Sequence, residues 1–330
     1  MSARILQYLD PNELPPGQLS KLQVEIGHDG LGRPMRLPVL AVRGRKPGPV
    51  LGITAALHGN ELNGIPVVQK LLCELDAGAL HGTVIGVVVV NVPGYLANER
   101  QFMNDWDLNH LFPGKPRGNS AQVYVHRLLE RIIKRWDILV DLHTASFGRT
   151  NSLYIRADMS KLATARMAYL MQPQIIVHNP ANDKTLRGHM ASVGVPAITV
   201  EVGNPQRYQG DFIKRTLRGL RAVLMEQKMI RPRPLTSGPE PILCRRSDWT
   251  YTDMGGLLEV FPQVTDPVSK GEPVAELRDP WGDVIQVYRA PADGVIIGRS
   301  ANPVAATGAR IIHLGRLMDK DDDSVIRRDM

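Results

Sequence analysis

The stretch "PGPVLGITAALHG", residues 47 to 59, decides which fold class the chain belongs to. Its apolar run is nearly continuous, which is typical of a strand buried on both faces rather than on one. Such strands occur in sheets that helices cover on both sides. The run ends at His58. Open α/β sheets place their ligand sites beyond the carboxyl ends of the strands, so this stretch predicts a fold and the position of a site.

Other segments with the same two patterns accompany it. A pair of strands joined by a Gly-rich turn is predicted over residues 22–43, and further buried strands over 83–90, 137–142, 152–156, 174–178 and 196–202. Helical spacing of apolar residues appears over 63–74, 121–135 and 211–228. Because buried strands alternate with amphipathic helices, residues 1–235 are predicted to form an α/β domain. Its sheet is expected to be mixed, mostly parallel and flanked by helices.

The pattern changes at the Pro-rich stretch "RPRPLTSGPEP", residues 231–241, which is typical of a linker. Short strands with frequent turns follow it, so we predict a small all-β, barrel-like domain over 236–318 and a flexible tail over 319–330. This barrel resembles biotinyl and lipoyl carrier domains. Its hairpin tip, "DPWGD" at 279–283, has no lysine to modify, and a swinging-arm role is therefore not expected.

Composition excludes several classes of protein. Apolar residues make up 43% of the chain and charged residues 22%, which is ordinary globular composition. The longest apolar stretch, Val84 to Val90, is too short to cross a bilayer. Two cysteines give no disulfide framework. The early acidic residues and prolines do not fit a secretory signal, so we expect a cytoplasmic protein without a membrane partner.

The net charge of +7 falls largely between Arg207 and Arg233. This run contains no recognisable nucleic-acid-binding module, and the surface of a solvated helix explains it. We therefore expect no nucleic-acid partner. A positive net charge also favours the binding of a small anionic substrate.

The octapeptide "LHGNELNG", residues 57–64, is ambiguous by itself. His58 and Glu61 are either polar residues of a turn or two ligands of a metal ion. His143, at the end of the predicted strand "DILVDL", is a candidate third ligand. Two histidines and a glutamate suit one Zn²⁺ per chain, with a position left for water whose pKa falls to about 7. Glu201, at the end of "PAITVEV", is either a general base or a salt-bridged strand end.

Four ordered motifs carry a family resemblance. They are "HGNE" (58–61), "NVPGYLANERQFMNDWDLNHLFPG" (91–114), "DLHT" (141–144) and "VEVG" (200–203). Together they resemble the succinylglutamate desuccinylase and aspartoacylase family, zinc-dependent deacylases with a carboxypeptidase-like α/β fold. The resemblance implies that His58, Glu61 and His143 bind zinc. It also implies that Glu201 is the general base and acid, and that Arg100 polarises the scissile carbonyl.

The same resemblance extends to the substrate pocket. It implies that Asp107 orients a metal-bound histidine and that Asn109 binds a substrate carboxylate. The family reads Asp-Leu-Asn-Arg where this chain reads "DLNH", so His110 stands where an arginine usually grips a carboxylate. A histidine offers one good donor where an arginine offers a bidentate fork. Arg149 and Arg156 are candidate replacements, unless the substrate lacks that carboxylate.

The sequence therefore predicts a hydrolase that cleaves the amide bond of an N-acylated amino acid or a similar small amide. Two alternatives remain open. One is a metallocarboxypeptidase that acts on small peptides, and the other is a non-catalytic protein that binds a metal ion or a small ligand. The oligomeric state is also left open, a homo-oligomer included.

Overall fold

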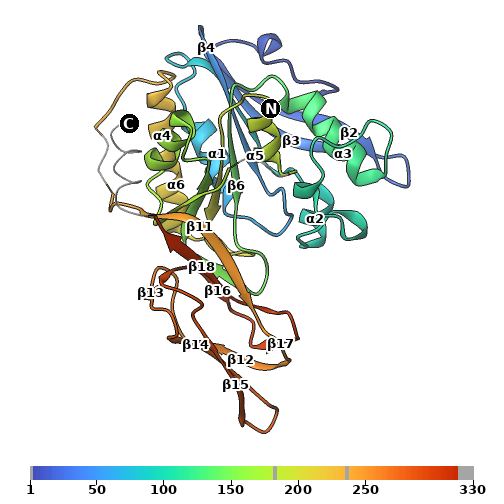
Figure 1. Ribbon diagram of the computed structural model, residues 1–330. Helices are drawn as coiled ribbons and strands as arrows, with labels where there is room; N and C mark the ends of the chain where they lie inside the picture. The colour runs from blue at the N-terminus through green and yellow to red at the C-terminus, as the bar shows by residue number, and fades with distance from the viewer. Residues whose placement is uncertain (1–2, 181–183, 235–237, 319–330) are drawn as a thin grey trace.

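The computed structural model describes residues 3–180, 184–234 and 238–318. One long sheet passes through the whole molecule (Figure 1). Its strands follow in the spatial order β1 (Arg4–Leu6), β2 (Gln18–His28), β3 (Pro34–Arg43), β5 (His81–Val87), β4 (Lys46–Ala55), β6 (Ile138–His143), β10 (Ala197–Val202), β8 (Leu153–Ala157), β9 (Ile175–His178), β11 (Ile242–Tyr251), β18 (Arg310–Leu317), β16 (Gly294–Ser300) and β13 (Pro267–Val268), with β7 (Arg149–Asn151) paired to β16.

The centre of the sheet is parallel, and the strands on either side of this centre are antiparallel to it. β5, β4, β6 and β10 run in one direction, while β3 and β8 run against their neighbours in this group. Ala55 of β4 is in register with Leu142 of β6, and His143 of β6 is in register with Glu201 of β10. The carboxyl ends of three neighbouring strands therefore meet at one edge. The prediction of a mixed α/β sheet is confirmed.

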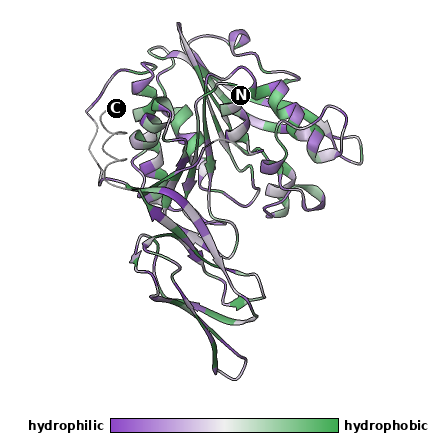
Figure 2. Cartoon of the chain, viewed as in Figure 1, coloured by the Kyte–Doolittle hydropathy of each residue, from purple (hydrophilic) through white to green (hydrophobic). Residues whose placement is uncertain are grey.

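Helices cover both faces of this centre. α1 (Gly64–Glu74), α4 (Leu162–Leu170) and α6 (Gly210–Glu226) pack on one face, and α3 (Ser120–Leu128) and α5 (Leu186–Ser192) on the other (Figure 1). The strands between them contain many hydrophobic residues (Figure 2). Successive residues of a strand point to opposite faces, and Leu139 and Val140 accordingly belong to different core clusters. The remaining helical segments are η1 (Pro11–Glu13), α2 (Val92–Ala97), η2 (Met103–Asp105), η3 (Leu108–His110) and η4 (Leu129–Ile133).

The predicted helix over 121–135 has two parts. α3 ends at Leu128, and a π turn, η4, continues it to Ile133. The apolar residues that defined the prediction are all buried: Val125, Leu128, Leu129, Ile132 and Ile133. The predicted strand over 83–90 ends at Val87 in the structure. Val88 and Val90 still donate backbone hydrogen bonds, to Pro38 and Ala55.

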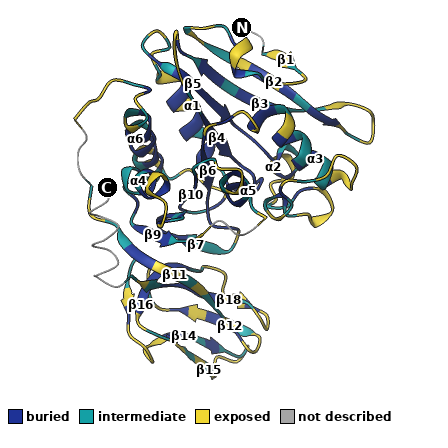
Figure 3. Ribbon diagram, turned by 45° about the horizontal axis from the view of Figure 1, so that its top comes forward, coloured by how far each residue is buried: buried dark blue, intermediate teal, exposed yellow. Residues whose placement is uncertain are grey.

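The C-terminal part of the chain forms a second, four-stranded sheet next to the end of the long one. It consists of β15 (Val284–Arg289), β14 (Pro273–Arg278), β12 (Gly256–Val260) and β17 (Val304–Ala305). The two sheets share one core, in which Leu258 and Leu277 lie with Ile311 and Leu314. Figure 3 shows that the outer surface of the small sheet is much more exposed than the central strands. A small all-β unit was predicted here.

The long sheet is continuous through this unit. β9 pairs in parallel with β11, and β11 pairs with β18. The predicted boundary between residues 235 and 236 and the predicted tail over 319–330 lie outside the described residues. In the described part of the chain, no helix is both long and apolar enough to cross a membrane.

A substitution at Gly52 tests how tightly the central strand β4 is packed. A Cβ atom on this residue would lie 1.8 Å from Cε3 of the Trp136 side chain, which is only 2% exposed. We expect Gly52→Ala to lower the free energy of unfolding by about 1–3 kcal/mol or more, because a packed core resists added volume. Denaturant unfolding measures this. Gly30→Ala, in a turn with open space around it, is the control, and equal stability of the two variants would contradict the described packing.

Candidate active site

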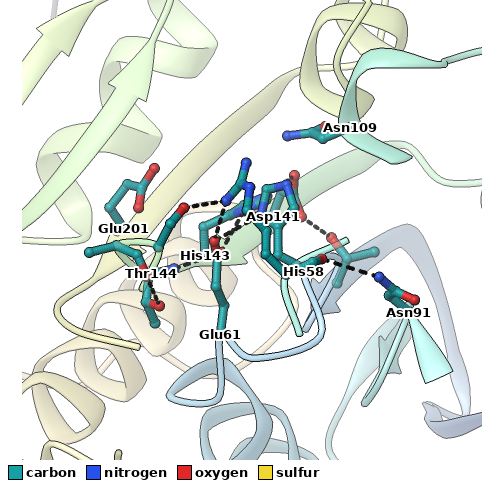
Figure 4. A network of polar contacts seen from close by, with 12 residues as sticks. His58, Glu61, Asn91, Asn109, Asp141, His143, Thr144 and Glu201 are labelled. Carbon is teal, nitrogen blue, oxygen red and sulfur yellow. Dashed lines mark hydrogen bonds and ion pairs between the residues drawn. The ribbon is translucent and has the colours of Figure 1, made fainter. Parts of the chain in front are cut away.

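Three predicted metal ligands meet at the carboxyl edge of the parallel strands (Figure 4). His58 and Glu61 lie in the loop after β4, and His143 is the last residue of β6. The Nδ1 atom of His58 lies 2.9 Å from Glu61 Oε1, and Nδ1 of His143 lies 3.0 Å from Glu61 Oε2. The two Nδ1 atoms are 3.2 Å apart. All three side chains are buried, so a metal ion bound there would be well shielded from solvent.

Each histidine has a carboxylate behind it. Nε2 of His58 lies 3.1 Å from Asp107 Oδ1, and Nε2 of His143 lies 2.8 Å from Asp141 Oδ2. When a metal ion is bound, each carboxylate would hold a proton on Nε2, so that the lone pair of each Nδ1 is free to bind the ion. Two imidazole nitrogens and a carboxylate are ligands that suit zinc.

The charges in this cluster shift the pKa values of its members. Burial alone would raise the pKa of Glu61, but the charge of His58 and hydrogen bonds from His143 and His58 hold it well below its usual range. Burial alone would lower the pKa of His143, but Asp141 and Glu61 raise it well above its usual value. Both shifts have the same source, since a buried carboxylate and a buried imidazole next to each other each stabilise the charged form of the other.

Glu201 lies beside the cluster, on the strand next to His143. The two residues are register partners in β10 and β6, and their side chains share one face of the sheet. Burial raises the pKa of Glu201. Asn151 donates from Nδ2 to Glu201 Oε2 at 3.3 Å, and Arg156 Nε lies 3.9 Å from Oε1, beyond hydrogen-bond length. A carboxyl group with a raised pKa is more easily protonated than an exposed one, which suits a group that takes up and then releases a proton.

Three polar groups fix the position of Arg100. Its guanidinium donates to Glu61 Oε1 at 2.8 Å, to Ser146 Oγ at 2.5 Å and to Asp107 Oδ2 at 3.0 Å. Asp107 thus contacts both a candidate ligand, His58, and the arginine. A guanidinium fixed in this way is suited to stabilising charge that develops on a nearby oxygen.

The remaining predicted residues lie farther out in the same cavity, whose volume is about 370 Å³. Asn109 uses its Oδ1 to accept a hydrogen bond from Leu186 N at 2.9 Å. His110 is largely exposed, and its Nε2 lies 3.9 Å from Asp107 Oδ2. Arg149 and Arg156 line the cavity as well. The structure therefore brings all ten predicted residues to one pocket.

Several residues of the pocket were not predicted from the sequence: Asp141, Ser146, Asn151, Tyr154, Arg187, Trp249 and Arg310. A local signal existed for Asp141, because residues two apart on a strand share a face. Asp141 and His143 have that spacing, and a buried aspartate inside an apolar strand needs a partner. Trp249 and Arg310 come from β11 and β18, and no local pattern connects them to the candidate metal ligands, which lie more than a hundred residues earlier in the chain.

Comparisons with known proteins find one family and several relatives. Residues 47–226 match the model of the succinylglutamate desuccinylase/aspartoacylase catalytic domain. The N-alpha-acetyl-L-2,4-diaminobutyric acid deacetylase of Halomonas elongata is 25% identical over 276 residues, 80% of this chain and 80% of that protein. The succinylglutamate desuccinylase of Pseudomonas paraeruginosa is 25% identical over 186 residues, 52% of this chain and 56% of that protein.

Solved structures with a similar fold include the ectoine utilization protein EutE of Ruegeria pomeroyi. Its TM-score is 0.83 at 19% identity, covering 92% of this chain and 98% of that one. A succinylglutamate desuccinylase/aspartoacylase from Rhodobacter sphaeroides has a TM-score of 0.81 at 21% identity, covering 92% of this chain and 95% of that one. At these identities the likeness concerns the fold.

Fold and site together define a class, the hydrolases that remove acyl groups from amides. Because the family model matches more than half of the chain, the protein belongs to the succinylglutamate desuccinylase/aspartoacylase family. The family predicted from the four motifs is confirmed.

A substitution of Asp141 tests the proposed metal ligands without changing any of them. In Asp141→Asn the hydrogen bond to His143 Nε2 loses its charge, and the imidazole becomes a weaker and less well oriented ligand. We expect zinc affinity to fall about 10–100-fold, measured by competition with a chelator of known affinity. Asp248→Asn, on the exposed part of β11, is the control. An unchanged affinity in a folded Asp141→Asn protein would contradict the assignment of His143 as a ligand.

Proposed function

We propose that the protein is a zinc-dependent hydrolase that cleaves the amide bond of an N-acylated amino acid or a similar small amide. The observation that carries this proposal is the buried group of His58, Glu61 and His143 with Glu201 beside it. The printed activities of two relatives, a deacetylase of an acetylated diamino acid and a succinylglutamate desuccinylase, support the reaction class. His58, Glu61 and His143 would hold one zinc ion per chain.

Zinc, when bound, is a Lewis acid and lowers the pKa of water towards about 7. The protein then has to move protons. A carboxylate oxygen of Glu201 accepts a proton from the attacking water and passes it to the nitrogen of the leaving amine. The water oxygen forms a bond to the carbonyl carbon, and the carbon–nitrogen bond breaks. The products are a carboxylic acid and an amine, which at neutral pH become a carboxylate and an ammonium ion. The raised pKa of Glu201 suits both steps.

Arg100 and Asp107 act on the scissile group and on the ligand geometry. The guanidinium of Arg100 donates to the carbonyl oxygen as negative charge develops on it, which lowers the barrier. Asp107 keeps Arg100 in place and orients His58 through Nε2. A substitution of Asp107 would therefore disturb two functions at once.

Cationic and polar residues around the cavity select the substrate. Arg149 and Arg156, with Asn109 and His110, line the outer part of the pocket. Guanidinium groups bind carboxylates with two parallel hydrogen bonds. A cavity of about 370 Å³ has room for a small amide. We therefore propose a small, anionic N-acyl amino acid or amide as the substrate.

Glu201→Gln tests the proton-transfer step. The variant keeps the size and burial of the side chain but cannot accept a proton, and we expect kcat for N-acyl amino acid hydrolysis to fall about 10²–10⁴-fold. Zinc content, measured on the same sample, should stay near that of the wild-type protein because Glu201 is not among the proposed ligands. Turnover at the wild-type rate in a folded variant would refute the assigned role.

Metal removal tests the dependence on zinc. Dialysis against a strong chelator should abolish hydrolysis of N-acyl amino acids, and added zinc should restore it, because all proposed chemistry takes place at the His58–Glu61–His143 group. The assay should include short peptides with a free carboxyl terminus, whose preferential cleavage would identify a carboxypeptidase. A metal-free protein that still turns over N-acyl amino acids would disprove the proposal.

A further inference from the structure

Two arginines and a tryptophan form a wall of the pocket that takes no part in the proposed bond-breaking and proton-transfer steps. The guanidinium carbon of Arg149 lies 5.6 Å from the centroid of the Trp249 ring, and that of Arg310 lies 5.3 Å from it. Both arginines and Trp249 line the catalytic cavity. Arg149 belongs to β7, while Trp249 and Arg310 belong to β11 and β18 of the C-terminal unit.

This wall contains two cations without a counter-ion. Among the residues that the structure describes, no carboxylate lies within ion-pair distance of Arg149 or Arg310. Arg100 differs from them, because it is bonded to Glu61 and Asp107. Burial lowers the pKa of Arg149 to about 10, and the charges of Arg310 and Arg100 act in the same direction. Two guanidinium groups close to each other raise each other's free energy, and an anion between them relieves that repulsion.

The Trp249 ring packs against His313, a buried and uncharged side chain. His313 stacks on Trp249 with 4.8 Å between centroids and 6° between planes. It is 2% exposed, and its Nε2 lies 2.8 Å from Ser247 Oγ. Burial and the charges of three arginines (Arg156, Arg149 and Arg310) hold the pKa of His313 well below its usual value. His313 therefore fixes the ring without adding charge, and the ring fixes the two guanidinium groups.

The wall lies at the mouth of the cavity. Arg149 also lines two grooves that adjoin the catalytic cavity, one beside Tyr251 and Arg310 and the other beside Gln101 and Ser146. Its strand β7 pairs with β16, with Arg149 in register with Ser300. Trp249 and Arg310 thus come from the C-terminal unit, and the pairing of β7 with β16 positions Arg149. A group bound there would be the part of the substrate that lies away from the metal ligands.

We propose that Arg149 and Arg310, packed against Trp249, form a subsite for a substrate carboxylate remote from the scissile amide. This inference rests on the proposed function and makes the C-terminal unit a determinant of specificity. Guanidinium groups match the planar geometry of a carboxylate. The carboxylate belongs either to a dicarboxylic acyl group or to the side chain of the amino acid, and the two sources differ only in which end of the substrate faces the mouth.

Arg310→Gln in the zinc-loaded enzyme tests the subsite with two matched substrate pairs. N-succinyl and N-butyryl derivatives of one neutral amino acid differ in a carboxylate on the acyl group. N-acetylglutamate and N-acetylglutamine differ in a carboxylate on the side chain. We expect KM to rise about tenfold or more for the charged member of one pair. The reason is that the variant loses hydrogen bonds to a charged group, and such bonds contribute more to binding than neutral ones. KM for the neutral member of that pair should stay unchanged, and kcat should change less than about twofold.

The affected pair identifies which end of the substrate the subsite binds. Arg149→Gln should give the same pattern, and Arg246→Gln, an exposed arginine on the same strand as Trp249, should leave every KM unchanged. Thermal unfolding of each variant checks that it is folded. Equal changes in KM for charged and neutral substrates, or no change for either pair, would overturn the proposal.

Binding without turnover separates this proposal from the proposed function. Calorimetry on Glu201→Gln protein, with and without Arg310→Gln, measures the affinity for the same four compounds. Loss of affinity for one charged compound alone supports the subsite, even if no N-acyl amino acid is ever hydrolysed by the wild-type enzyme. Hydrolysis by the wild-type enzyme together with affinities that do not depend on Arg310 overturns the subsite and leaves the proposed function intact.

Discussion

The carboxylate of Glu61 is buried between two histidine nitrogens and the guanidinium of Arg100, and the rest of the site depends on this arrangement. A buried anion is tolerated only when it is paired and hydrogen-bonded. Thr144 completes its contacts by donating its backbone N–H to Glu61 Oε2 at 3.0 Å. The register of β4, β6 and β10 makes this possible, because it places His58, His143 and Glu201 at one edge of the sheet.

A further carboxylate contacts the far nitrogen of each histidine, and these carboxylates are themselves hydrogen-bonded. Asp141 is fully buried and accepts a hydrogen bond from Thr54 Oγ1 at 2.6 Å in addition to contacting His143. Thr54, Asp141 and Thr199 are in register on neighbouring strands. The strands therefore supply both the candidate ligand and the group that would orient it. A site assembled from separate segments of the chain needs such supporting hydrogen bonds to keep its geometry.

The sequence predicted the central strands and the inner part of the site, because both leave local signals. Apolar runs such as that of residues 50–57 are read directly, and His58, Glu61, His143 and Glu201 stand at the ends of such runs. The outer wall left no such signal. "ILCRRSDWTY", residues 242–251, has neither a clean alternation nor an apolar run, so β11 and its Trp249 were missed. The pairing of β11 with β9 and with β18, in which Trp249 is in register with His313, brings that residue to the pocket.

That pairing also changes how the C-terminal unit should be understood. The sequence indicates a carrier-like barrel after a linker, whereas in the structure the long sheet passes from the catalytic strands through β11 into β18 and β16. β7, which follows His143 by only a few residues, pairs with β16. Side chains on both sides of the cavity are thus held by one hydrogen-bonded framework. A change in the packing of the small sheet would move Arg149 and Asn151 together.

Anomalous X-ray diffraction at the zinc edge, on crystals of the zinc-loaded protein, tests the proposed metal site directly. We expect one strong peak per chain, between the Nδ1 atoms of His58 and His143 and the carboxylate of Glu61. We also expect Nε2 of each histidine to keep its contact with Asp107 or Asp141. A peak at other residues, or ligation through Nε2 with both aspartates displaced, would contradict this ligand set.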